Sequence, residues 1–71
     1  MNLTDALLKQ EYTVKSVETD DEELNSFLFS LGCYGGEKIT VVKQNKNGCI
    51  VLIKDARYSI DRHLASAISI E

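Results

Sequence analysis

The stretch from Leu28 to Val41 constrains the fold more than any other part of this chain, because a helix end, a glycine corner and a strand follow one another there. Gly32 stands where a left-handed residue ends a helix at no steric cost, and the Gly35-Gly36 pair can turn the chain. Ile39 and Val41 then alternate with polar neighbours, as strand residues do. Just before the corner, apolar residues at spacings of three and four predict one helical face turned to the core: Leu24, Phe27, Leu28 and Leu31.

Composition limits the class of protein. With 71 residues the chain has room for one core, so residues 1–71 are expected to form a single domain. Hydrophobic residues make up 44% and charged residues 27%, which is typical of a soluble globular domain rather than a disordered one. The net charge of −3 disfavours a nucleic-acid partner, and no apolar run approaches the length of a membrane span or signal peptide. We therefore expect a cytoplasmic protein with no membrane insertion, whose Cys33 and Cys49 remain free thiols.

Short strands and tight turns account for most of the remaining sequence. We expect strands over residues 12–17, 39–42, 49–54, 58–60 and 67–70. Asn47-Gly48 suits a type I′ hairpin turn, because both positions tolerate positive φ. Five short strands at hairpin spacing predict a mainly β fold, namely a small and strongly bent antiparallel barrel.

Three helical segments are expected before and between these strands. Thr4-Asp5 can cap a short helix through Leu8, with Leu3, Leu7 and Leu8 turned to the core. Asp20 or Asp21 can cap the main helix, and the acidic residues around its start complement the helix dipole. Asp61 can cap a single turn over residues 62–65, before the last strand.

The order of these elements resembles the FeoA family. Two segments carry the resemblance: Leu28-x-x-Leu31-Gly32-x-x-x-Gly36-x-x-Ile39-x-Val41, and the ending Tyr58-x-Ile60-Asp61-x-x-Leu64-Ala65-x-x-Ile68-x-Ile70. With Leu3 and Val14-x-x-Val17 added, the likeness spans nearly the whole chain. The same module is similar to the C-terminal SH3-like domain of DtxR-type metal-dependent repressors. The sequence departs from the family pattern at Gly35, where proline is common, at Cys33, and at the aromatic residues Phe27 and Phe29.

The resemblance implies a small SH3-like barrel that acts as an accessory protein of ferrous iron uptake. Its expected partner is the cytosolic part of a FeoB-type transporter, with no cofactor and no catalytic residues. The residues agree that chemistry is sparse: His63 is the only histidine, and the glycines lack the Lys-Ser/Thr of a phosphate-binding loop. Cys33, Cys49 and His63 have no paired ligand spacing, so no metal site is expected. A small metal-binding or metal-sensing domain and an SH3-like nucleic-acid-binding module remain as alternatives.

Phe29 is the best candidate for a partner contact, because it lies beyond the apolar stripe of its helix. Either the N-terminal helix covers its ring, or the ring faces water beside Tyr34 and anchors another protein. An exposed edge strand over residues 58–60 could also pair with a second copy and give weak self-association. The residues expected to bind a partner are Phe29, Cys33, Tyr34, Gly35 and Tyr58.

Overall fold

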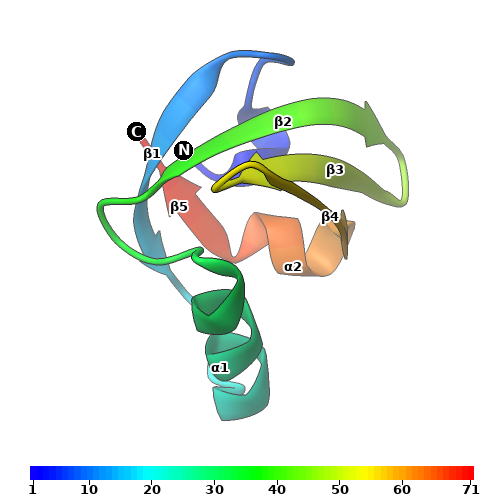
Figure 1. Ribbon diagram of the computed structural model, residues 1–71. Helices are drawn as coiled ribbons and strands as arrows, with labels where there is room; N and C mark the ends of the chain where they lie inside the picture. The colour runs from blue at the N-terminus through cyan, green and yellow to red at the C-terminus, as the bar shows by residue number, and fades with distance from the viewer.

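The computed structural model describes all residues, 1–71, and shows one five-stranded antiparallel sheet in the order β4-β3-β2-β1-β5 (Figure 1). The strands are β1 (Glu11–Val17), β2 (Lys38–Asn45), β3 (Gly48–Ile53), β4 (Ala56–Asp61) and β5 (Ile68–Ile70). Helix α1 (Glu22–Leu31) joins β1 to β2, helix α2 (Arg62–Ser66) joins β4 to β5, and a 3-10 turn, η1 (Leu3–Asp5), precedes β1. No helix is both long and apolar enough to cross a bilayer.

Strand β1 bends the sheet into a barrel-like shape. Its first half, Glu11–Thr13, pairs with β2, and its second half pairs with β5, with a register shift between Val14 and Ser16 within that pairing. Such an irregularity sharpens the local twist and lets one strand serve two neighbours. The expected SH3-like fold of five strands is confirmed, but the barrel does not close, because β4 and β5 end the strand order without pairing. Helix α2 packs against β3, β4 and β5.

The core is formed by alternate residues of the strands, which explains the period-two pattern in the sequence. In β3, for example, Cys49, Val51 and Ile53 are buried while Ile50 and Leu52 are only half-buried. The core contains sixteen residues: Leu3, Ala6, Tyr12, Val14, Leu28, Cys33, Ile39, Val41, Cys49, Val51, Ile53, Ile60, Leu64, Ala65, Ile68 and Ile70.

Helix α1 projects from the barrel (Figure 1). Only Leu28 is fully buried, while Leu24 and Leu31 pack against the core from its margin. The expectation that Phe27 faces the core is wrong, since its side chain is 48% exposed. A helix that leans on a barrel at one end can bury a narrower stripe than the periodicity suggests.

The N-terminal helix is shorter than the sequence suggests. Its cap is Asn2 rather than Thr4-Asp5, because the Asn2 side chain accepts the Thr4 N–H while the Asp5 carboxylate accepts the Asn2 N–H. The turn ends at Asp5 and leaves Leu3 buried. Leu7 and Leu8, expected in the core, are exposed.

The expected type I′ turn at Asn47-Gly48 is wrong, and a turn with positive φ occurs in the next hairpin instead. The β2–β3 turn has Lys46-Asn47 at its centre, and no residue there has positive φ. The Asn45 side chain holds this turn by accepting the N–H groups of Asn47 and Gly48. Positive φ occurs instead at Lys54 (49°) and Asp55 (67°), which form a type I′ pair between β3 and β4.

The two ends of the chain lie next to each other (Figure 1). The Ile70 N–H donates to the Met1 carbonyl at 2.8 Å, and Asn2 forms an isolated bridge with Ser69. The first residues therefore extend the sheet beside β5, whose two isoleucines are buried.

Candidate functional site

The end of α1 fixes the position of the aromatic residues. Gly32 adopts φ 92°, its N–H donates to the Phe29 carbonyl at 3.0 Å, and the Cys33 N–H donates to the Leu28 carbonyl at 2.9 Å. This is a Schellman motif, in which the residues at the positions of Leu28 and Cys33 make a hydrophobic contact. Both side chains are 1% exposed and belong to the core. The end of α1 is therefore anchored to the core through Leu28 and Cys33.

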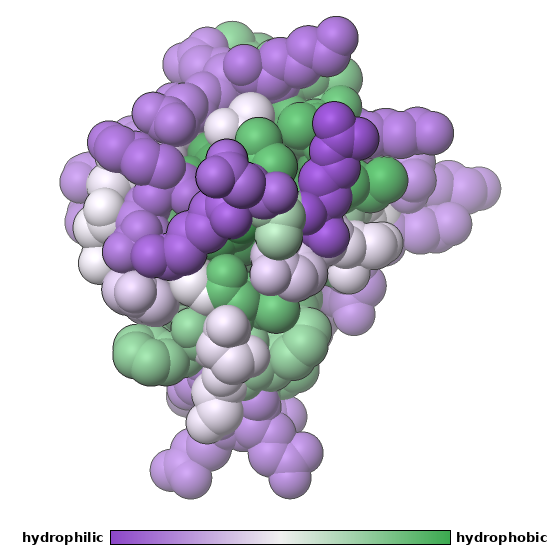
Figure 2. Space-filling view, in the orientation of Figure 1, coloured by the Kyte–Doolittle hydropathy of each residue, from purple (hydrophilic) through white to green (hydrophobic).

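Phe29 stacks on Tyr34 at the surface. Their ring centroids are 4.7 Å apart and the rings are inclined by 29°. Phe29 is nevertheless 65% exposed, so the alternative in which the N-terminal segment covers it is wrong. Offset stacking contributes on the order of 1 kcal/mol and holds the ring in place without burying it. Figure 2 shows apolar side chains projecting from the lower part of the molecule, where α1 lies.

Lys54 extends this surface from the β3–β4 turn. Its Nζ lies 5.7 Å from the Tyr34 ring centroid and 3.3 Å from Glu37 Oε2. A hydrogen bond and the negative charge of Glu37 raise the pKa of the Lys54 ammonium, so it stays positively charged. The stem of Lys54 also covers Gly32, where an added Cβ would lie 2.8 Å from its Cε. Lys54 thus contacts both the aromatic pair, through Tyr34, and the carboxylate of Glu37.

The corner beneath the aromatic pair is tied to β1. The Gly36 N–H donates to the Val14 carbonyl, and the Val14 N–H donates to the Glu37 carbonyl, both at 2.8 Å. Gly35 lies close to β1 as well, since a Cβ there would approach the Lys15 carbonyl oxygen to 3.1 Å. A larger residue at Gly35 would therefore require the Lys15 backbone to shift by a few tenths of an ångström.

The structure brings together three of the five residues expected to contact a partner. Phe29, Tyr34 and Gly35 share the surface at the end of α1, and we call this the aromatic surface. Cys33 lies beneath it with its thiol in the core, as the Schellman pattern would have indicated. Tyr58 lies on β4 and lines a different groove. Sequence reasoning missed Lys54, because only the tertiary fold brings the β3–β4 turn to Gly32 and Tyr34.

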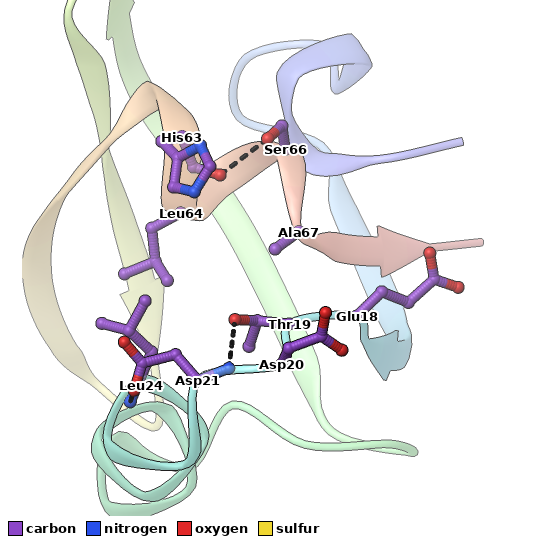
Figure 3. Close-up of a pocket in the computed structure, with 9 residues that line it drawn as sticks. All are labelled: Glu18, Thr19, Asp20, Asp21, Leu24, His63, Leu64, Ser66 and Ala67. Atoms are coloured by element: carbon purple, nitrogen blue, oxygen red, sulfur yellow. Dashed lines mark hydrogen bonds between the residues drawn. The ribbon is translucent and has the colours of Figure 1, made fainter.

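A second groove, of about 440 Å³, separates the start of α1 from α2 (Figure 3). Asp21 caps α1, as expected, by accepting the N–H groups of Glu23 and Leu24. His63 lies across the groove from Asp20 and Asp21 in Figure 3. No group of three or more His, Cys, Asp or Glu residues lies close enough to hold a metal ion. Helix capping accounts for the position of Asp21 in this groove.

The two cysteines are buried as free thiols. Burial raises the pKa of Cys33 from 9.0 to about 11, and it also raises the pKa of Cys49. A thiol held protonated in the core is a poor nucleophile and a poor metal ligand.

We expect this burial to make stability fall at alkaline pH. Because burial raises the folded pKa of Cys33, the folded chain holds more protons than the unfolded chain between about pH 9 and about pH 11. The free energy of unfolding therefore falls as the pH rises through this range. Urea unfolding across this range should show a declining free energy of unfolding, and Cys33→Ala should show a shallower decline. An equal slope in both proteins would contradict the assignment.

Comparison with known proteins shows the family and the fold of the chain. A family model of the FeoA domain matches residues 1–71, and no curated protein matches the chain in sequence. The fold matches Stenotrophomonas maltophilia FeoA complexed with zinc, a prokaryotic SH3 domain protein, with a TM-score of 0.87 at 20% identity over 100% of this chain and 89% of that one. It matches Chlorobium tepidum FeoA with a TM-score of 0.86 at 20% identity, over 100% and 69%.

A larger protein contains the same fold. A manganese-dependent transcriptional repressor in complex with manganese matches with a TM-score of 0.89 at 18% identity, over 100% of this chain and 35% of that one. At such identities the likeness shows the SH3-like fold, and the family follows from the model that matches the full length. The chain therefore belongs to the FeoA family, which is linked to ferrous iron transport.

Proposed function

We propose that this protein is a non-catalytic, cytoplasmic accessory protein of ferrous iron uptake that docks on the cytosolic part of a FeoB-type transporter. The aromatic surface, made by Phe29, Tyr34 and Gly35, is the docking site. The observation that carries this proposal is the Phe29 ring, 65% exposed and yet held by its stack on Tyr34. An exposed aromatic ring with a fixed orientation loses little conformational entropy on binding, which is typical of interface anchors.

The surroundings of the ring support a protein partner rather than a small ligand. The Schellman end of α1 and the backbone bonds between Gly36 and Val14 hold the surface in one conformation. Lys54 and Glu37 add one charge of each sign at its margin, where charged groups at interfaces select partners more than they strengthen binding. Helix α1, which carries Phe29, projects from the barrel (Figure 1).

An amide NMR titration with the nucleotide-binding cytosolic domain of the cognate transporter tests this function. Chemical shift changes concentrated at residues 29–36 and at Lys54 are the expected result. The absence of any change at high micromolar concentrations of both proteins would count against docking on that domain. Changes confined to β4 would place the contact at Tyr58 and remove the aromatic surface from the proposal.

We expect Phe29→Ala to weaken transporter binding by about tenfold or more, because truncating an anchor residue typically costs at least 1.4 kcal/mol. Its effect on folding should stay near 1 kcal/mol, the value of the lost stack. Phe27→Ala is the matched control, since Phe27 is an exposed ring on the same helix and has no aromatic partner. Calorimetric titration of the transporter domain with each variant distinguishes them, and equal losses would refute a specific role for Phe29.

A further inference from the structure

The outer face of β2, β3 and β4 carries a groove of about 660 Å³ that the proposed docking site does not use. We call it the basic groove. The sheet register explains its position: Lys43 pairs with Ile50, which pairs with Ser59, and these side chains lie opposite the buried row of Val41, Val51 and Cys49. Its lining is Lys9, Val42, Lys43, Ile50, Arg57, Tyr58 and Ser59.

Three cations surround this groove, and its lining contains no carboxylate. Lys9, Lys43 and Arg57 are all exposed and form no ion pair, since the one ion pair in the protein joins Lys54 to Glu37. A local excess of positive charge in a chain whose net charge is −3 means that the negative charges lie elsewhere. Unpaired cations gathered at one concave site attract an anionic ligand.

The floor of the groove is apolar. Val42, Ile50 and Tyr58 are half-buried there, and Val42 occupies the bulge where the β2–β3 register shifts. Lys9 reaches the same bulge because its N–H donates to the Val41 carbonyl at 2.7 Å. On the face that β2, β3 and β4 present in Figure 1, apolar atoms are bordered by hydrophilic side chains in Figure 2.

We propose that the basic groove binds an extended acidic peptide from another protein, whose carboxylates pair with Lys9, Lys43 and Arg57 and whose aliphatic side chains cover Val42 and Ile50. Charge complementarity favours an anionic occupant, and the aliphatic floor favours a peptide over a nucleic acid. Two of the three floor residues have no aromatic ring on which a base could stack, and the negative net charge repels a long phosphate backbone. The volume of the groove suits a short peptide segment.

A fluorescent peptide that alternates glutamate with leucine is the probe for this site. We expect it to bind in low salt, to release as salt is added, and to shift the amide signals of Ile50 and Ser59. The same peptide with glutamine in place of glutamate should bind at least about tenfold more weakly. Equal binding of the two peptides would overturn the proposal.

Variants locate the site. The double variant Lys43→Gln, Arg57→Gln should weaken peptide binding about tenfold, since it removes two of the three ion pairs. Lys46→Gln, Arg62→Gln is the matched control: it removes the same charge from exposed residues outside the groove, and it should leave binding unchanged. Equal loss in both variants would mean that net charge rather than the groove binds the peptide.

Two further measurements test whether the basic groove binds a different occupant. Tighter binding of a single-stranded oligonucleotide than of the peptide would replace the proposal with a nucleic-acid site. Sedimentation that shows self-association, abolished by the groove variant and retained in the control variant, would make a second copy the occupant and would equally overturn it. Peptide binding does not depend on Phe29, so Phe29→Ala separates this proposal from the transporter-docking proposal.

Discussion

Gly48→Ala is expected to destabilise the fold by about 3 kcal/mol, which is most of the stability that a core of this size supplies. A Cβ at Gly48 would clash with the Ile60 carbonyl oxygen and would lie 3.0 Å from the Asp61 Cα. Both obstacles are backbone atoms, so no side chain can move aside. Strands β3 and β4 would have to separate where they begin their pairing.

Gly36→Ala is the matched control for this prediction. Gly36 has φ 92° but no atom within 4 Å of an added Cβ, so alanine there meets strain without a clash. Its expected cost is about 1 kcal/mol. Urea unfolding followed by circular dichroism measures both variants, and a Gly48→Ala protein as stable as Gly36→Ala would show that the strands can adjust.

Leu28→Ala is expected to cost about 3 kcal/mol and to loosen α1 from the barrel. Leu28 is the one fully buried residue of α1, so its truncation leaves a cavity at the point where the helix joins the core. The aromatic surface depends on this anchor, because Phe29 and the Schellman end adjoin it. We therefore expect transporter binding to fall together with stability.

Hydrogen exchange distinguishes local loosening from global unfolding. The amides of α1 should lose protection in Leu28→Ala more than those of β2 and β3 do. Phe27→Ala removes an exposed ring from the same helix and should change the free energy of unfolding by about 0.5 kcal/mol or less. A loss of protection that is uniform over the whole chain would mean that α1 and the barrel unfold as one unit.

The strands could be predicted from the sequence because their burial follows local alternation. Ile68 and Ile70, for instance, face the core on either side of a half-buried Ser69, as their spacing indicates. The caps Asp21 and Asp61 are likewise local, since each carboxylate accepts at least one N–H group within its own first turn. Such features need no knowledge of distant contacts.

The errors arose where a tertiary contact decides the role of a residue. Gly48 looks like a turn glycine, but it is needed because β4 passes too close for any side chain. Phe27 and Leu7 have suitable spacing for the core, yet both side chains are exposed. The aromatic surface was foreseen only in part, because the contact of Lys54 with Tyr34 joins segments far apart in the chain.

The hydrogen bond between Ile70 and Met1 has a consequence for protein engineering. Because the two ends meet, a short Gly/Ser linker could join them, and new termini could be opened at the exposed Lys46-Asn47 turn without stretching any strand. Because both ends lie at one point, the domain is also suited to insertion into a loop of another protein through two short linkers.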